Sequence, residues 1–208
     1  MLTKEMLNTY NVFREDVFKP LTFKEIKRLA KKRSQNAMVL ALDEFRRLGI
    51  VKTRKTGNVA TYAANMDSSL ALGYLEVLNG LEWHKEKKIP KRILQDIQER
   101  VFKYSEYFTL GVFGSHAVHE ATPKSDLDIV LIVDSPQAKK EVIPYLETIK
   151  RREITPLDYH VFTRQEFLEM LSDDEENLEK QIYAKSKIYY GLIPYYHLVK
   201  GSPYAKTG

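Results

Sequence analysis

Two aspartates interrupt an otherwise apolar run, "SDLDIVLIV", at positions 126 and 128. Side chains alternate between the two faces of a strand, so Asp126 and Asp128 share one face while Leu127 and Ile129 pack on the other. Two like charges at the start of an apolar strand repel each other and are poorly hydrated, and a cation between them offsets this cost. Because carboxylate oxygens select hard cations, the pair predicts a Mg²⁺ site that works with substrate phosphates.

Two other segments could complete such a site. The run "LGVFGS" predicts a strand that leads into Gly114 and Ser115, where glycine permits a sharp turn. The amides of a following helix N-terminus, together with the Ser115 hydroxyl, would suit a phosphate. Asp158 lies in a third strand-like run, "PLDYHVF", and a neighbouring strand would bring it beside the first pair. Taken alone, Asp158 could also be the charge of an edge strand.

The elements that must position these residues alternate from Lys91 onward. Alternation of strands and helices predicts an α/β layer, here a small mixed sheet flanked by helices. The pattern predicts a helix over 92–106, strands over 107–113, 127–133 and 157–163, a helix over 136–152, and a mostly helical tail.

The first 65 residues predict a different arrangement, three helices followed by a β-hairpin. Thr22 is a suitable N-cap for the second helix, and Glu25 would complete a capping box. Apolar residues at helical spacing predict the third helix, which Gly49 would end. Two β-prone runs flank Thr56-Gly57-Asn58, which is a hairpin signal.

Charge and composition suggest two units with different partners. Residues 1–65 hold 14 lysines and arginines against 6 acidic residues, a net charge of +8, whereas the remainder carries 19 against 22, a net charge of −3. A lysine-rich solvated surface would give the same imbalance. We expect domains at 1–65 and 91–208, joined over 66–90 by a helix and a short linker.

Composition also excludes several classes of protein. The chain has no cysteine, so disulfides and thiolate metal sites are excluded, and the composition suits a reducing cytoplasm. Charges interrupt the first twenty residues, which do not resemble a signal peptide. No window of about 18 uncharged apolar residues occurs, so we expect a cytoplasmic protein without a membrane segment.

The helices and hairpin of residues 1–65 resemble a winged helix-turn-helix module. This resemblance implies that double-stranded DNA is contacted by the start and end of the third helix and by the hairpin, or wing. Winged helices also serve as protein-docking domains, and that alternative stays open. The residues that the resemblance assigns to DNA are Lys31, Lys32, Arg33, Gln35, Asn36, Arg46, Arg47, Lys52, Arg54 and Lys55.

The pattern of hydrophobic-Gly-Ser, ten residues and Asp-hydrophobic-Asp resembles the DNA polymerase β-like nucleotidyltransferase superfamily. Within it, "GSHAVHEATPKSDLDIVLIV" is most similar to the small prokaryotic nucleotidyltransferases, which include antitoxin partners of HEPN-domain proteins. The resemblance implies that Gly114 and Ser115 hold the triphosphate of a nucleoside triphosphate. It also implies that Asp126 and Asp128 bind Mg²⁺, as two ions, and that Asp158 is a further metal ligand or the base for the acceptor hydroxyl.

The sequence departs from this family at one place. Many small members read Gly-Ser-x-Ala-Arg-Gly, whereas Val118 and His119 stand here in place of the arginine and glycine. A DNA-binding regulator or an antitoxin with a degenerate transferase-like domain is therefore the alternative to an enzyme. His116 and His119 could suggest a metal pair, although ordinary helix histidines explain them as well. The acceptor, the nucleotide, a HEPN-type partner and a homodimer are left open by the sequence.

Overall fold

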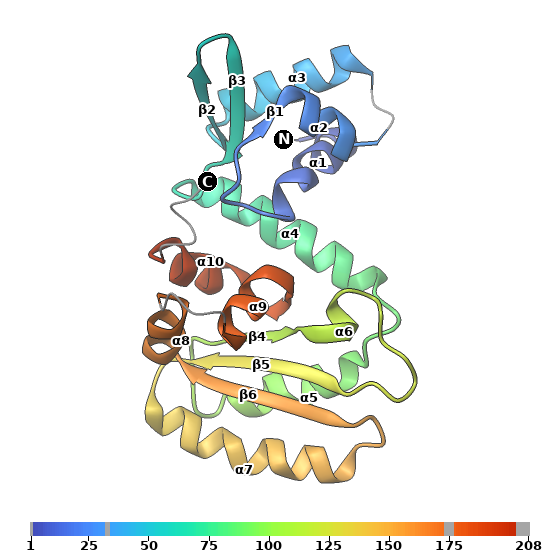
Figure 1. The fold of residues 1–208 in the computed structure, drawn as a ribbon, viewed down its shortest axis with the longest axis vertical. Helices are drawn as coiled ribbons and strands as arrows, with labels where there is room; N and C mark the ends of the chain where they lie inside the picture. Colours follow the sequence, from blue (N-terminus) through green and yellow to red (C-terminus); the bar gives the residue numbers. More distant parts are fainter. Residues whose placement is uncertain (1, 32–33, 173–176, 203–208) are drawn as a thin grey trace. The chain divides into compact units, whose positions relative to one another are not determined.

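The computed structural model describes residues 2–31, 34–172 and 177–202, which form two compact units (Figure 1). The division falls between Leu81 and Glu82, inside helix α4 (Ser69–Lys85) and inside the predicted connecting segment. Across the described residues, no helix is long and apolar enough to cross a membrane. The first unit contains, before α4, α1 (Lys4–Tyr10), the 3-10 helix η1 (Asn11–Arg14), β1 (Leu21–Thr22), α2 (Phe23–Leu29), α3 (Gln35–Arg47), β2 (Val51–Thr56) and β3 (Val59–Ala64).

Local capping signals set the ends of the helices in the first unit. Thr22 and Glu25 form the predicted capping box at the start of α2. Ser34 caps α3, and Gly49, with φ of 65°, follows its last turn as predicted. The predicted hairpin is confirmed as β2 and β3, which pair antiparallel around Gly57. The sequence did not predict β1, because two residues that pair with β3 leave no periodic pattern.

Aromatic and aliphatic side chains fill the core of the first unit. Tyr10, Phe13 and Phe45 are fully buried, and the Tyr10 ring lies 5.7 Å from Phe13 and 5.3 Å from Phe45 between centroids. The Tyr10 hydroxyl donates a hydrogen bond of 3.2 Å to the Ile50 carbonyl, directly before β2. The helices and the hairpin therefore share one core, and the base of the hairpin is held by it.

The second unit contains a four-stranded mixed sheet with the order β6-β5-β4-β7. β5 and β6 are parallel, whereas β4 pairs antiparallel with both β5 and β7. The predicted small mixed sheet flanked by helices is confirmed. The elements are α5 (Lys91–Val101), β4 (Thr109–Val112), α6 (Gly114–Ala117), β5 (Leu127–Val133), α7 (Pro136–Arg152), β6 (Leu157–Thr163), α8 (Arg164–Leu171), α9 (Leu178–Lys185), β7 (Lys187–Tyr190) and α10 (Leu192–Lys200).

The tail is helical as predicted except at β7. The run "KIYY" extends the sheet beside β4, with Gly111 opposite Ile188 and Val112 opposite Lys187. The Trp83 indole donates a hydrogen bond of 2.6 Å to the Ile188 carbonyl. A strand of four residues between helices follows no period of its own, so its pairing with a distant strand decides its conformation.

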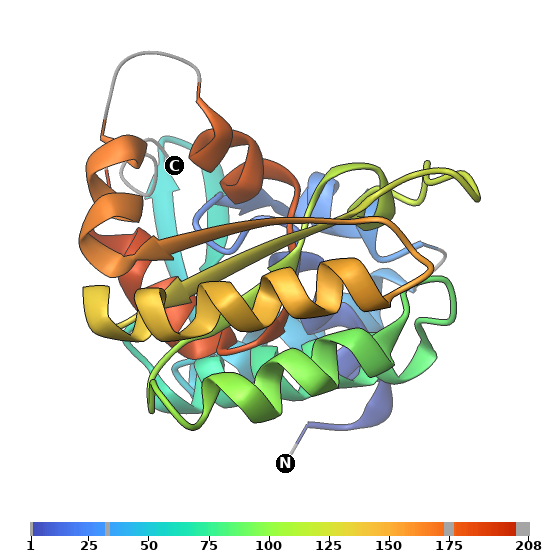
Figure 2. The ribbon, with the colours of Figure 1, turned by 90° about the horizontal axis from the view of Figure 1, so that it is seen from below.

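Helices α5 and α7 cover one face of this sheet, where they run side by side (Figure 2). Their apolar stripes meet the inward side chains of β5, including Leu127, Ile129 and Leu131, all of which are fully buried. Residues at the alternate positions of β5, among them Asp128, must therefore face the side of the sheet away from α5 and α7.

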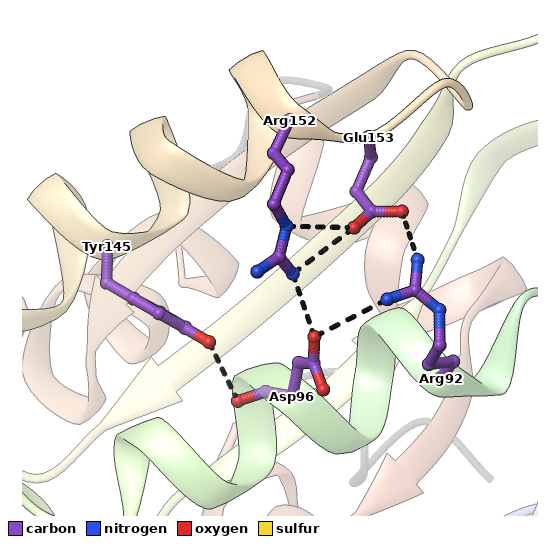
Figure 3. Close-up of polar contacts among 5 residues, drawn as sticks. All are labelled: Arg92, Asp96, Tyr145, Arg152 and Glu153. Atoms are coloured by element: carbon purple, nitrogen blue, oxygen red, sulfur yellow. Dashed lines mark hydrogen bonds and ion pairs between the residues drawn. The ribbon is translucent and has the colours of Figure 1, made fainter.

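A charged network joins α5 to the end of α7 (Figure 3). Asp96 lies 2.9 Å from the Arg152 guanidinium and 3.8 Å from that of Arg92. Glu153, whose side chain is only 9% exposed, accepts a hydrogen bond of 2.5 Å from Arg92 and contacts Arg152 at 3.2 Å. The Tyr145 hydroxyl reaches the Asp96 carbonyl at 3.4 Å. This network holds the segment that leads into β6.

Candidate active site

The turn after β4 brings glycine against an aspartate of the neighbouring strand. Gly114 has φ of 63°, in the left-handed region that glycine adopts without strain. A Cβ atom at this position would overlap the Asp128 carboxylate, lying 2.9 Å from its Cγ. The Phe113 amide donates a 3.0 Å hydrogen bond to the Asp128 carbonyl, which fixes the turn to β5. Gly114 and Ser115 therefore lie directly beside Asp128.

Asp128 and Asp158 are cross-strand neighbours on the parallel strands β5 and β6. Asp128 is half-buried, and burial, followed by the charges of Asp158 and Asp126, raises the pKa of its carboxyl group. The imidazoles of His116 and His160 act in the opposite direction. The structure thus brings the three predicted carboxylates near one another, and their mutual repulsion is the condition that a bound cation would relieve.

Asp126 lies one residue before β5 and is exposed. The loop that leads to it closes on itself, because the Ser125 amide donates to the Thr122 carbonyl at 3.0 Å and the Thr122 amide donates to the Ser125 hydroxyl oxygen at 2.9 Å. This turn sets the point at which Asp126 enters the site.

Asp158 already has two partners. One carboxylate oxygen lies 3.6 Å from the Lys150 ammonium on α7, and the other lies 3.4 Å from Nε2 of His160. Lys150 also lies over the Tyr159 ring, at 5.7 Å from its centroid. Asp158 is thus a partly neutralised carboxylate at the edge strand β6, and Lys150 is a neighbour that the sequence pattern did not reveal.

The donor chemistry of these side chains fits a hard divalent cation. Asp128 and Asp158 lie opposite each other on adjacent strands, and burial, followed by the charges of Asp158 and Asp126, raises the pKa of Asp128. Within the part of the chain that the structure describes, no group of three or more His, Cys, Asp or Glu side chains is placed so that it could hold a metal ion. A Mg²⁺ site is therefore indicated by the chemistry of the carboxylates and not by a ligand arrangement in the structure.

Beside these carboxylates lies a second polar group that sequence reasoning did not predict. Lys187 on β7 lies 2.8 Å from Nε2 of His119 and 3.2 Å from the carboxylate of Glu86, which is buried. His119 has φ of 63°, so the backbone here keeps the conformation in which the family has glycine. The Val118 side chain is partly exposed. The departure from the family pattern at Val118 and His119 was the one sequence feature that pointed to this polar group.

The predicted DNA-binding residues that the structure describes lie on or just before α3 and on the hairpin of β2 and β3. Gln35 and Asn36 are exposed in the first turn of α3, and Lys31 is exposed before it. The two residues predicted between them, Lys32 and Arg33, lie outside the described residues.

The remaining predicted DNA-binding residues differ in their pairing with acidic side chains of the same chain. Arg46 and Arg47 pair with Asp43 at 3.6 Å and Glu44 at 2.6 Å. Lys52 pairs with Asp67. On the hairpin, the exposed residues Arg54 and Lys55 lie opposite Thr61 and Ala60.

Comparison with known families gave one match. A family model described as nucleotidyltransferase domain matches residues 91–199, just over half of the chain and almost all of the second unit. Comparisons with curated proteins and with solved structures found no significant match.

Proposed function

The chain belongs to the nucleotidyltransferase domain family, and from this premise we propose that it transfers a nucleoside monophosphate from a nucleoside triphosphate to a hydroxyl acceptor, with release of pyrophosphate. The observation that carries the proposal is the contact between the turn at Gly114 and Asp128, in register with Asp158. A phosphate-binding turn and acidic side chains on two adjacent strands are the parts that phosphoryl transfer requires in one place.

Each residue has a role in this proposal. Gly114 and Ser115 hold the triphosphate, and Asp126, Asp128 and Asp158 would bind Mg²⁺ as two ions. When bound, magnesium would supply positive charge for the attacking oxygen and for the leaving pyrophosphate.

The covalent step is a displacement at the α-phosphorus. The acceptor oxygen forms a bond to the α-phosphorus, the bond from this phosphorus to the oxygen of the β-phosphate breaks, and pyrophosphate leaves. Asp158 takes the hydroxyl proton of the acceptor, or, if it serves as a metal ligand, the proton passes to water. Lys150, at 3.6 Å from Asp158, restricts the orientation of this carboxylate.

The test is release of pyrophosphate from each of ATP, CTP, GTP and UTP with Mg²⁺ and candidate hydroxyl acceptors. We expect release with at least one nucleotide, loss of release with EDTA, and loss in Asp128→Asn and Asp158→Ala proteins that keep their circular dichroism spectra. Full Mg²⁺-dependent transfer by either variant would overturn the assignment of these carboxylates.

We also propose that the first unit is a winged helix-turn-helix that binds double-stranded DNA. The order of helix, strand, two helices and two strands supports this proposal, as does the exposure of Arg54 and Lys55 on the hairpin. Binding should weaken steeply as salt rises, because phosphate contacts release counterions. Anisotropy titrations of a labelled duplex at several salt concentrations measure this slope.

A regulator or antitoxin with a degenerate transferase domain is the second candidate, and the replacement of arginine and glycine by Val118 and His119 favours it. Salt-dependent duplex binding without pyrophosphate release from any nucleotide would support the regulator. Pyrophosphate release would exclude a degenerate domain.

A further inference from the structure

A cavity of about 520 Å³ opens beside the candidate active site, within the second unit. Basic side chains line it: Lys87 and Lys88 from the segment before α5, and His116 and His119 from α6 and the loop after it. The hydroxyls of Thr122, Ser125 and Thr155 add polar groups, whereas no carboxylate is among the described lining residues. Ser125 directly precedes Asp126, so the cavity adjoins the carboxylates without including them.

One side chain in this cavity lacks the partner that burial demands. The Nε2 atom of His116 is buried and has no hydrogen-bond partner among the described residues. Buried polar atoms in native proteins are nearly always paired, and leaving one unpaired costs about 1–3 kcal/mol. His116 lines the cavity, so an unsatisfied polar atom lies just behind the cavity wall.

A buried network orients the basic groups around the cavity. Glu86, 8% exposed, accepts a 2.8 Å hydrogen bond from the Lys88 amide and a 3.2 Å hydrogen bond from the Lys187 ammonium. Lys187 in turn lies 2.8 Å from Nε2 of His119. An ammonium group can only donate, so Nε2 accepts and the proton of the ring lies on Nδ1. The Nδ1 atom lies 3.9 Å from the Glu86 carboxylate, so Glu86 and Lys187 together hold the His119 ring at the edge of the cavity.

We propose that this cavity is a phosphate-binding pocket in which Lys87 and Lys88 supply the charge, His116 and the hydroxyls of the lining supply donors, and Glu86 and Lys187 hold the ring of His119 in the wall. The proposal rests on the proposed function, because the reaction offers two sources of phosphate: the terminal phosphates of the donor nucleotide and a phosphorylated acceptor. Lysine ammonium groups, imidazole N–H groups and hydroxyls without a carboxylate suit a dianionic phosphate.

The test is calorimetric titration of the full chain with pyrophosphate, without Mg²⁺ so that the aspartates contribute no metal bridge. We expect the Lys87→Ala, Lys88→Ala double variant to bind pyrophosphate roughly tenfold or more weakly, since each lost charge-assisted contact weakens binding severalfold. The matched control is Lys103→Ala, Lys140→Ala, which removes the same charge from exposed lysines outside the cavity. We expect this control to change the affinity by less than about twofold, because these two lysines do not line the cavity and salt screens charges at longer range.

His119→Gly tests the contribution of the His119 ring to the cavity wall separately. Glycine accepts the φ of 63° without strain, so this variant removes the imidazole without imposing a new backbone conformation. We expect weaker pyrophosphate binding with an unfolding temperature that is unchanged or higher. The proposal fails if the wild type binds no pyrophosphate, or if the control pair weakens binding as much as the Lys87 and Lys88 pair does.

A second set of titrations identifies the source of the phosphate. The wild type and the Lys87→Ala, Lys88→Ala variant are each titrated with AMP and with α,β-methylene ATP. If the variant binds the ATP analogue more weakly than the wild type does, and AMP equally well, the pocket takes the terminal phosphates of the donor. Unchanged analogue binding, together with weakened pyrophosphate binding, assigns it to a phosphorylated acceptor. Lysine-dependent pyrophosphate binding without any nucleotidyl transfer would leave the pocket standing and refute the proposed enzyme. Nucleotidyl transfer together with pyrophosphate binding that does not depend on Lys87 and Lys88 would support the enzyme and refute the pocket.

Discussion

At the scale of single residues, the candidate site depends on a glycine that has no room for a side chain. Gly114 combines a left-handed backbone with direct packing against the Asp128 carboxylate. The two constraints are independent, since a larger residue would meet both backbone strain and overlap with a charged group. The ionised form of Asp128 is itself disfavoured, because burial and the neighbouring aspartates raise the pKa of its carboxyl group.

Gly114→Ala should lower the free energy of unfolding by about 1–3 kcal/mol and abolish nucleotidyl transfer, because the new methyl group displaces Asp128. The matched control is Gly73→Ala in α4, where a Cβ atom meets nothing within 4 Å. Alanine is the better helix former, so this control should raise the free energy of unfolding by about 0.5–1 kcal/mol. Urea denaturation measures both. Equal effects at the two glycines would contradict the close packing at Gly114.

Glu86 gives the pH dependence of stability at the same scale. Burial raises the pKa of Glu86, but hydrogen bonds from the Lys88 amide and Lys187, with the nearby charges, lower it below its ordinary value of 4.5. A carboxyl group with a lowered pKa stabilises the fold above its unfolded pKa, and this contribution is lost as the pH falls through the folded pKa.

Glu86→Gln should therefore unfold more easily than the wild type at pH 7, and the difference should shrink as the pH falls below 4.5. Thermal unfolding of both proteins between pH 3 and pH 7 measures it. A difference that stays constant over this range would show that the ionised carboxylate contributes nothing.

At the scale of elements, the charged network between α5 and α7 fixes the segment that leads from the end of α7 into β6. Glu153, almost buried, lies between the guanidinium groups of Arg92 and Arg152 at the end of α7. Three residues later, the Pro156 carbonyl accepts a 2.7 Å hydrogen bond from the Leu127 amide, where β5 begins. The register that places Asp128 opposite Asp158 thus follows directly from the way α7 ends.

Glu153→Ala should lower the free energy of unfolding by about 1–3 kcal/mol, because it removes a buried acceptor of charged hydrogen bonds. Arg92→Ala, whose side chain is 67% exposed, should cost less than about 1 kcal/mol and should matter less at high salt. Urea denaturation with added sodium chloride is the suitable measurement, because the denaturant guanidinium chloride is itself a salt and would screen these ion pairs. A larger effect at Arg92 would contradict the dominance of the buried carboxylate.

At the scale of the whole molecule, the chain divides into two units that each have their own core. The basic surface proposed for DNA lies in the first unit, and the carboxylates lie in the second. Because these sites share no residue, substitutions in one should leave equilibrium binding at the other intact unless the two units are coupled.

Arg54→Ala, Lys55→Ala should weaken duplex binding and reduce the salt slope by roughly two phosphate contacts, while nucleotidyl transfer stays unchanged. Asp128→Asn should abolish transfer and keep duplex binding. Its unfolding temperature should stay the same or rise at pH 7, because asparagine removes an ionisation that the fold disfavours. Loss of transfer in the wing variant would show that the two units act on each other.

The sequence by itself determined the local features of this protein. Period and capping predicted α2 with its Thr22–Glu25 box, the hairpin at Gly57, and the bounds of β5, α7 and β6, because these depend on neighbouring residues. The Gly-Ser and Asp-x-Asp pattern predicted a nucleotidyltransferase, and the family model supports that prediction. The roles of Asp126, Asp128 and Asp158 stay predictions.

Only the tertiary structure decided how distant segments meet. β7 extends the sheet because Lys187–Tyr190 pairs with β4, which lies more than seventy residues earlier. The same pairing brings Lys187 to His119 and to Glu86, separated from it by 68 and 101 positions. No local period encodes such contacts, because they depend on which strands become neighbours when the core is buried. The basic cavity beside the carboxylates is a product of that burial.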